Sequence, residues 1–378
     1  MTYIHQQETW PNLTWQDQVL AASLAHVRHR QGRLIGRMEA LGFALRSEAV
    51  LQTLTEDVIK SSEIEGDILD KDQVRSSIAR RLGMDVAGLV PAERSVEGVV
   101  EMMLDATQNY DQPLTEDRLF GWHASLFPTG RSGITKITVG DWRTDATGPM
   151  QVVSGPIGRE RVHFQAPSAP RLGDEITQFL DWLNADKDID DVIAAGIAHF
   201  WFVTIHPFDD GNGRIARAIA DLVLARSENS PQRFYSMSSQ IRAQRNQYYD
   251  MLEATQKVGL DITAWLKWFL SCLDHAFDKA DETISVVLVK ARFWELMSDQ
   301  SFNDRQRLVL NRMLDDFDGK LTSSKWAKLA KCSQDTASRD IYDLIAKGAF
   351  VRGPSGGRST SYELIVEHET ASTIVKLK

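Results

Sequence analysis

Cysteine is scarce in this chain of 378 residues, and the two cysteines that it has, Cys272 and Cys332, lie far apart. Two isolated cysteines provide neither a metal-binding cluster nor the disulfide framework of a small secreted domain. The start of the chain also lacks the basic segment and apolar core that are typical of a signal peptide. These absences predict a protein of the reducing cytoplasm.

Long apolar runs are missing as well. The longest one, residues 192–205, is 14 residues long, whereas a helix needs about 20 residues to span a bilayer. We therefore predict a buried helix in this region and no membrane partner.

Positive charge does not dominate, since the chain has 43 basic and 52 acidic residues and a net charge of −9. This balance excludes a protein that coats nucleic acid over its whole surface, although it allows a local basic patch. The length allows two or three domains of ~100–200 residues each.

Apolar residues recur at helical spacing along most of the chain, which predicts a mainly α fold. In residues 46–59, for example, Val50, Leu54 and Val58 repeat every four residues. The same spacing predicts helices at about 93–109, 115–126, 170–184, 191–204, 213–227, 241–255 and 262–288. Residues 142–167 differ, because alternating runs at 151–154 and 161–164 flank a Gly155-Pro156 turn. This pattern predicts a β-hairpin.

A separate unit is expected at the C-terminal side, over residues 303–370. Three helices are predicted at 305–317, 323–330 and 333–347, followed by two short β-type runs at 350–352 and 361–364 with a glycine-rich stretch between them. Three helices and a hairpin in this order predict a winged helix-turn-helix. Residues 289–302 would connect it to the rest of the chain.

The richest motif is the run from His206 to Arg217, HPFDDGNGRIAR, which directly follows the apolar run. Gly211 and Gly213 allow a sharp turn whose backbone N–H groups form a cradle for an anion. The helix that begins at about Arg214 adds its positive N-terminal end. Arg214 and Arg217 are three residues apart and share a helix face. Together these features predict a polyphosphate site.

The remaining residues of the run add chemistry or support. Asp210 provides an oxygen ligand for Mg²⁺, and His206 is able to accept a proton near neutral pH. Phe208, between polar neighbours, is expected to anchor the loop to the core. Two simpler interpretations stay open, namely an ordinary surface turn, and a metal hydrolase with His199 and His206 as ligands.

These twelve residues resemble the signature of the Fic family, HxFx(D/E)GNGRxxR, and the resemblance extends over about residues 90–270. It implies a helical Fic core with a hairpin flap, and an enzyme that transfers AMP from ATP to a Ser, Thr or Tyr hydroxyl of a protein. His206 would deprotonate that hydroxyl and Asp210 would hold Mg²⁺. The phosphates would be bound by Asn212 with the loop amides and by the two arginines.

The resemblance also implies two further parts of the site. The flap around Val153, Ser154 and Gly155 would bind the target segment by strand addition, unless it is a purely structural hairpin. In the family, the adenine and ribose pocket is lined at the positions of Tyr248, Tyr249 and Gln256. Gln256 stands where relatives often have Asn. For the two tyrosines, simple packing in the core stays open as an alternative.

An earlier segment, Ser61-Ser62-Glu63-Ile64-Glu65-Gly66, is similar to the family's inhibitory motif, (S/T)xxxE(G/N). The resemblance implies that Glu65 pairs with Arg217 and keeps it from the γ-phosphate, while Glu63 points elsewhere. Ser61 lies four residues before Glu65 on the same helix face, and Gly66 lets another backbone approach. The predicted organisation is thus an N-terminal extension with the inhibitory helix (1–90), a Fic domain (91–288) and a winged helix (303–370).

Several alternatives remain open. Residues 303–363 hold 11 basic and 8 acidic residues, which favours a surface for DNA or protein. The third helix, however, carries Asp335, Asp340 and Asp343, which weakens phosphate contacts. A nucleotide-sensing DNA-binding regulator and an enzyme that removes AMP from modified proteins are the competing functions. Self-modification is expected to be feasible, and the target protein and a homodimeric state are left open.

Overall fold

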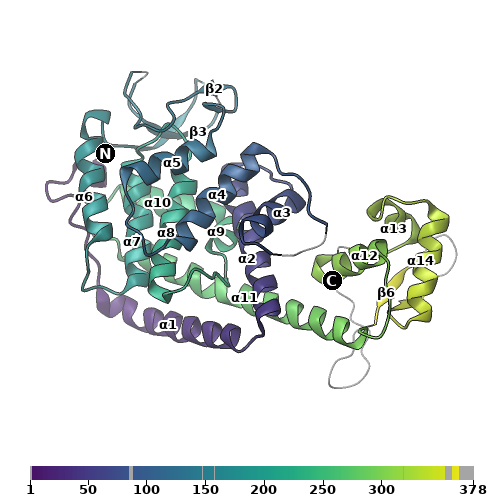
Figure 1. The fold of residues 1–378 in the computed structure, drawn as a ribbon. Coiled ribbons are helices and arrows are strands. Elements are labelled where there is room, and N and C mark those ends of the chain that lie inside the picture. The colour runs from purple at the N-terminus through teal and green to yellow at the C-terminus, as the bar shows by residue number, and fades with distance from the viewer. Residues whose placement is uncertain are drawn as a thin grey trace. The chain divides into compact units, whose positions relative to one another are not determined.

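The computed structural model describes residues 2–84, 88–146, 148–156, 158–317, 319–353 and 360–365. Within these residues helices dominate, and the sheets are three antiparallel pairs of strands (Figure 1). The prediction of a mainly α fold is therefore confirmed. Contacts divide the chain into two compact units, one of residues 1–41, 50–85 and 89–280, and one of residues 42–49, 86–88 and 281–378.

The first unit is built largely from helices of the first 280 residues. Its helices are η1 (Ile4–Gln6), α1 (Asp17–Glu39), most of α2 (Phe43–Glu65), α3 (Lys71–Arg81), α4 (Arg94–Gln108), α5 (Glu116–Leu126), η2 (Ala169–Arg171), α6 (Leu172–Asn184), α7 (Asp191–Ile205), α8 (Asn212–Glu228), α9 (Met237–Ala243), α10 (Arg245–Gln256) and the first part of α11 (Thr263–Leu296). Its strands are β1 (Arg131–Ser132), β2 (Thr135–Lys136), β3 (Gln151–Ser154) and β4 (Arg161–Gln165). The hairpin predicted within 142–167 is thus present as β3 and β4, with a bulge between Val152 and Val153.

The centre of this unit is α7, in which every residue from Val192 to Ile205 is buried. The predicted buried helix is confirmed, and no helix among the described residues is long and apolar enough to cross a membrane. Asp190 caps the start of α7 by accepting from the Val192 N–H at 2.8 Å. The helix ends at His206, whose φ of 52° places it in the left-handed region. The chain therefore leaves the core in a sharp turn at the predicted phosphate loop.

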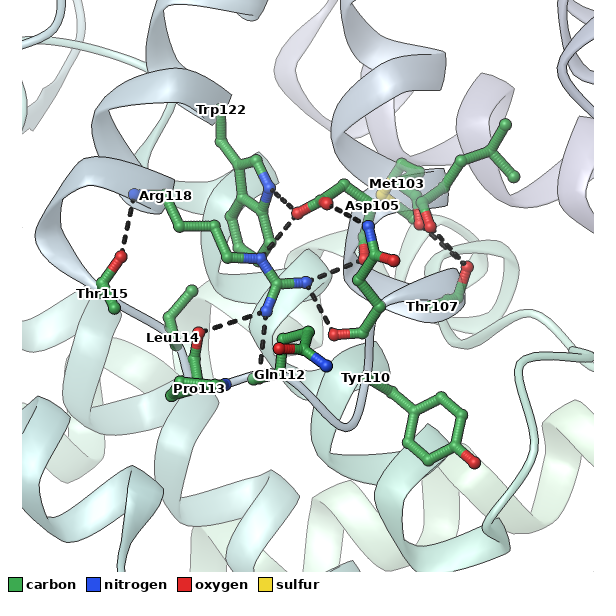
Figure 2. A network of polar contacts seen from close by, with 12 residues as sticks. Met103, Asp105, Thr107, Tyr110, Gln112, Pro113, Leu114, Thr115, Arg118 and Trp122 are labelled. Carbon is green, nitrogen blue, oxygen red and sulfur yellow. Dashed lines mark hydrogen bonds and ion pairs between the residues drawn. The ribbon is translucent and has the colours of Figure 1, made fainter.

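A polar network ties α4 to α5, as Figure 2 shows. The Arg118 guanidinium donates to the Asp105 carboxylate at 2.6 Å and to the carbonyls of Asp105 and Asn109 at 2.8 and 3.0 Å. Arg118 thereby satisfies acceptors that the end of α4 leaves open. Trp122 Nε1 donates to the same carboxylate at 2.7 Å. The network fixes α5, whose C-terminal end supports the phosphate loop.

Some predicted boundaries are wrong. The helix expected at 241–255 is two helices, α9 and α10, which meet at Gln244 with φ −111° and ψ 29°. The Ser236 side chain caps α9 by accepting from the Ser239 N–H, a separate start that the apolar spacing does not reveal. The connector expected at 289–302 is helical up to Leu296, because Phe293 is buried and extends the apolar face of α11.

The second unit contains α12 (Asp304–Asp316), α13 (Ser323–Leu329), α14 (Gln334–Ala346), β5 (Phe350–Arg352) and β6 (Tyr362–Leu364). Trp326, Ile341 and Phe350 lie at the centre of its own core. The three helices and the two strands occur in the predicted order, and the winged-helix interpretation stays a prediction.

Two of the three acids on α14 are engaged inside this unit. Asp340 is 6% exposed and accepts from Arg305 Nε at 2.9 Å. Asp343 accepts from Gln306 Nε2 at 2.8 Å and forms an ion pair with Lys347. Two of the acids and the two basic side chains that pair with them are thus engaged inside the unit, and DNA binding stays a prediction.

Candidate active site

The loop that joins α7 to α8 is shaped by Asn212. Its side chain is 2% exposed, accepts from the Phe208 N–H at 3.0 Å and donates to the Phe208 carbonyl at 2.9 Å. Both polar groups of the amide are thus used to close residues 208–212 into a compact turn. The side chain of Asn212 therefore holds the loop together.

The underside of the loop rests on aromatic side chains. Phe208 is fully buried and stacks on His123, with ring centroids 4.1 Å apart and an angle of 10° between the ring planes. The role predicted for Phe208 as an anchor is confirmed. Gly211 has a φ of 84°, and a Cβ there would lie 2.9 Å from the ring of Phe127. Glycine is therefore required at this position for both its conformation and its size.

His206 lies at the rim of this loop and is half-buried. Its Nδ1 lies 3.1 Å from the Val203 carbonyl, which can only accept, so Nδ1 carries the proton and Nε2 keeps a free lone pair. Burial lowers the pKa of His206 from 6.5 to about 4. The ring is therefore neutral at pH 7, in the form that accepts a proton.

The backbone of His206 is fixed by Arg143, a residue that the sequence did not single out. The buried Arg143 guanidinium donates to the carbonyls of His206 at 2.7 Å and of Pro167 at 2.6 Å. Its backbone N–H also donates to the Pro207 carbonyl at 3.0 Å. Arg143 thus connects the phosphate loop to the residues that flank the β3–β4 hairpin.

Arg217, on the first turns of α8, is 1% exposed in its side chain and is held by the end of α2. Its Nη2 donates to Glu65 Oε1 at 2.8 Å and to the Ser61 carbonyl at 2.8 Å, and its Nε donates to Ser61 Oγ at 2.9 Å. The structure therefore brings Ser61, Glu65 and Arg217 together. Glu63 forms ion pairs with Lys60 instead, at 3.0 Å, and with Arg242.

Gly213 explains how Glu65 comes so close to the loop. A Cβ on Gly213 would lie 2.3 Å from Glu65 Oε1, which is far below any van der Waals contact. The absence of a side chain at this position lets the carboxylate lie against the first turn of α8. Arg245 secures the end of α2, because its Nε donates to the Ile64 carbonyl at 2.7 Å.

Asp210 is the residue that could hold Mg²⁺. One carboxylate oxygen accepts from the Gly211 N–H at 2.6 Å and the other from the hydroxyl of Ser132. The described part of the chain contains no group of three His, Cys, Asp or Glu residues that could enclose a metal by itself. A single oriented carboxylate fits Mg²⁺, which is commonly held by one or two carboxylates together with substrate phosphates.

The metal-hydrolase interpretation finds no support in the geometry. His199 is fully buried, and its Nε2 lies 2.9 Å from the Tyr248 hydroxyl. Burial lowers the pKa of His199 to about 3. His199 and Tyr248 therefore form a hydrogen-bonded pair inside the core.

The other expected pocket residues take different positions. Tyr248 is 1% exposed, which favours the core-packing interpretation for this tyrosine. Tyr249 lies beside the end of α2, with the Arg245 guanidinium 5.3 Å from its ring centroid. Gln256 is buried and donates to Thr204 Oγ1 at 3.2 Å.

The hairpin presents β3 as a strand that is paired on one side only within the described residues. Val153 is 48% exposed on it, and Gly155 ends it with a φ of 104°. The Ser154 hydroxyl lies 2.5 Å from His163 on β4. At the base of the hairpin, Phe164 is buried against Tyr3. An extended peptide could therefore pair with the free edge of β3.

Two family models match this chain. The model described as Fic/DOC family matches residues 113–224, and a domain of unknown function, DUF4172, matches residues 3–84. The first match includes the loop and both arginines described above. The chain therefore carries a Fic/DOC domain.

Known proteins similar to the chain carry names from the same family. Protein adenylyltransferase Fic of Culex quinquefasciatus is 30% identical over 132 residues, which are 34% of this chain and 25% of that protein. Protein adenylyltransferase fic-1 of Caenorhabditis elegans is 42% identical over 70 residues, which are 18% of this chain and 14% of that protein. The chain thus covers about a quarter or less of the length of these relatives.

A similar solved structure is the crystal structure of a Fic domain containing signaling protein from Bacteroides thetaiotaomicron. It matches with a TM-score of 0.50 at 19% sequence identity, over 68% of this chain and 97% of that chain. At this identity the match shows a shared fold.

Proposed function

We propose that this chain is a protein adenylyltransferase that transfers AMP from ATP to a hydroxyl of a protein, and that Glu65 inhibits it. The names of its relatives support the reaction. The observation that carries the proposal is that a neutral His206, a compact loop closed by Asn212 and two arginines meet where α7 ends and α8 begins.

In the proposed reaction, the acceptor hydroxyl oxygen attacks the α-phosphorus of ATP. A P–O bond forms to the acceptor, the bond to pyrophosphate breaks, and the hydroxyl proton passes to Nε2 of His206. The loop amides hold the phosphates, and Arg214 and Arg217 balance the charge of the leaving pyrophosphate. Reactions of this kind depend on positioning and charge neutralisation, which this set of groups can provide.

Asp210 would hold Mg²⁺, which when bound neutralises phosphate charge. The Ser132 hydroxyl and the Gly211 N–H, which both donate to its carboxylate, keep that carboxylate oriented toward the loop.

The inhibition follows from the three hydrogen bonds that Arg217 donates to α2. With Nε and Nη2 of Arg217 engaged by Ser61 and Glu65, this guanidinium is not available for a two-pronged contact with a phosphate. ATP then lacks its partner at the outer phosphate, and the α-phosphorus is not presented in line to the acceptor.

The test is transfer of label from ATP to protein by the purified chain in a Glu65→Gly background, with the wild-type chain for comparison. We expect label on the α-phosphate to appear on protein, and label on the γ-phosphate to leave with pyrophosphate. His206→Ala should lower transfer by at least a hundredfold, since general bases commonly contribute ~10²–10⁴-fold. ATP affinity by calorimetry should change little, because the base faces the acceptor and not the phosphates.

Mass spectrometry of the labelled product identifies the modified hydroxyl. Transfer of the γ-label would identify a phosphotransferase instead. A His206→Ala variant that transfers AMP at the wild-type rate would remove this residue from the mechanism.

A further inference from the structure

The chain reverses direction directly after Glu65. Gly66 has a φ of 96°, its N–H donates to the Glu63 carbonyl at 3.2 Å, and the N–H of Asp67 donates to the Ser62 carbonyl at 3.0 Å. These two bonds form a Schellman motif, which ends a helix and holds the backbone of the residue that follows its glycine. The position of Asp67 is therefore set by the same turn that ends α2.

Asp67 is directed at the other arginine of the loop. Its Oδ2 lies 3.0 Å from Nη1 of Arg214. The Arg214 side chain is 7% exposed, and its guanidinium carbon lies 5.1 Å from the ring centroid of Phe127. A planar cation that lies on an aromatic ring and meets a carboxylate at its edge is held in one orientation.

Arg214 keeps unused capacity for a ligand. Its Nε is buried and makes no hydrogen bond within the described residues. A buried donor without a partner is unfavourable, and a phosphate oxygen would satisfy it. The guanidinium is thus shaped for an anion, and Asp67 occupies one part of it.

We propose that Asp67 is a second inhibitory acid, which competes with the outer phosphates of ATP for Arg214. Glu65 and Asp67 are two residues apart, and the turn at Gly66 directs them at Arg217 and Arg214, which are three residues apart on α8. This inference rests on the proposed function, since it assigns both arginines to the phosphates of ATP. The segment of residues 65–67 then engages both arginines of the site.

The expected size of the effect follows from the exposure of the pair. The Asp67 side chain is 56% exposed, so water and salt screen its attraction to Arg214. Removing the charge should therefore tighten ATP binding by about two- to fivefold, a smaller gain than release of the more buried Arg217 should give.

The test is calorimetric binding of ATP, ADP and adenosine to the wild-type chain and to Asp67→Asn. We expect about two- to fivefold tighter binding of ATP and ADP, a smaller gain at 0.5 M salt, and unchanged binding of adenosine, which has no phosphate. Asp70→Asn is the matched control. It removes one negative charge three residues further on, and asparagine still caps α3, where Asp70 accepts from the Gln73 N–H.

Equal gains for Asp67→Asn and Asp70→Asn, or an unchanged ATP affinity in Asp67→Asn, would overturn the proposal. Transfer assays in a Glu65→Gly background separate it from the proposed function. If no variant transfers AMP and Asp67→Asn still binds ATP more tightly, the transferase assignment is wrong and the Asp67 assignment stands. If Glu65→Gly transfers AMP and adding Asp67→Asn changes neither ATP affinity nor KM, Asp67 is not inhibitory.

Discussion

Under the proposed function, replacing Glu65 by glycine should raise AMP transfer without adding any catalytic group. In the structure Arg217 is held by two residues of α2, Ser61 and Glu65. Glu65 is the charged one, and its Oε1 lies 2.8 Å from Arg217 Nη2. A charge-assisted contact between a freed Arg217 and a phosphate is worth about 1.5–3 kcal/mol. If this free energy lowers the activation barrier in full, AMP transfer becomes roughly ten- to hundredfold faster.

The same change should destabilise the protein in the absence of nucleotide. Arg217 is 1% exposed and would lose its counter-charge, and leaving a buried charge uncompensated costs up to ~3–5 kcal/mol. Ser61 still accepts two hydrogen bonds from it, so the loss should lie below that limit. Saturating ATP should restore the melting temperature, because phosphate replaces the carboxylate.

Transfer rates of four proteins at saturating Mg²⁺ and ATP decide this prediction. Glu63→Gly is the matched control, since it makes the same change on the same helix at a residue paired with Lys60. Combining Glu65→Gly with Arg217→Ala should abolish the gain, because the freed arginine is the group that binds phosphate. The reasoning is refuted if Glu65→Gly is no faster than wild type, or if Glu63→Gly activates to the same extent.

Two further predictions concern stability. Gly213→Ala should lower the free energy of unfolding, measured in urea, by about 1–3 kcal/mol, because the added Cβ would lie 2.3 Å from Glu65 Oε1. Most of this loss should disappear in a Glu65→Gly background, where the carboxylate is absent. Equal losses in both backgrounds would contradict the contact. Burial lowers the pKa of His123 and His206 to about 4 and that of His199 to about 3. Between pH 6.5 and 4 the unfolded chain therefore binds more protons than the folded chain, and the free energy of unfolding should fall as the pH is lowered. Urea unfolding at pH 7.5, 5.5 and 4.5 measures this, and a constant free energy would argue against buried neutral rings.

The sequence predicted the parts of the site that depend on local spacing. Gly211, Gly213 and the two arginines fall within one turn and the helix after it, so their proximity follows from chain geometry alone. The contact between Glu65 and Arg217 joins residues 152 positions apart. It was predicted only through the resemblance of residues 61–66 to a family motif.

Other parts of the site could not be predicted in this way. Arg143 and His123 act through contacts with the loop that arise only when distant segments pack together. Neither belongs to a spacing pattern that marks a ligand or a catalytic group. Asp67 carries a local signal, because a glycine that ends a helix fixes the residue after it, but its partner on α8 is visible only in three dimensions.

The helix that carries Glu65 is also part of the core. Val50, Leu54, Val58 and Ile64 on α2 are at most 4% exposed, and Asp57 accepts from the hydroxyl of Ser236 and from the N–H of Ser238. Withdrawing α2 as a whole would expose these apolar side chains and leave a buried carboxylate without donors. Under the proposed inhibition, relief is therefore expected to act on the last turn of α2, by rotating the Glu65 side chain or shifting residues 61–66. For the same reason, a fragment that begins after residue 66 should be less stable than the whole chain, because it lacks these buried side chains of α2.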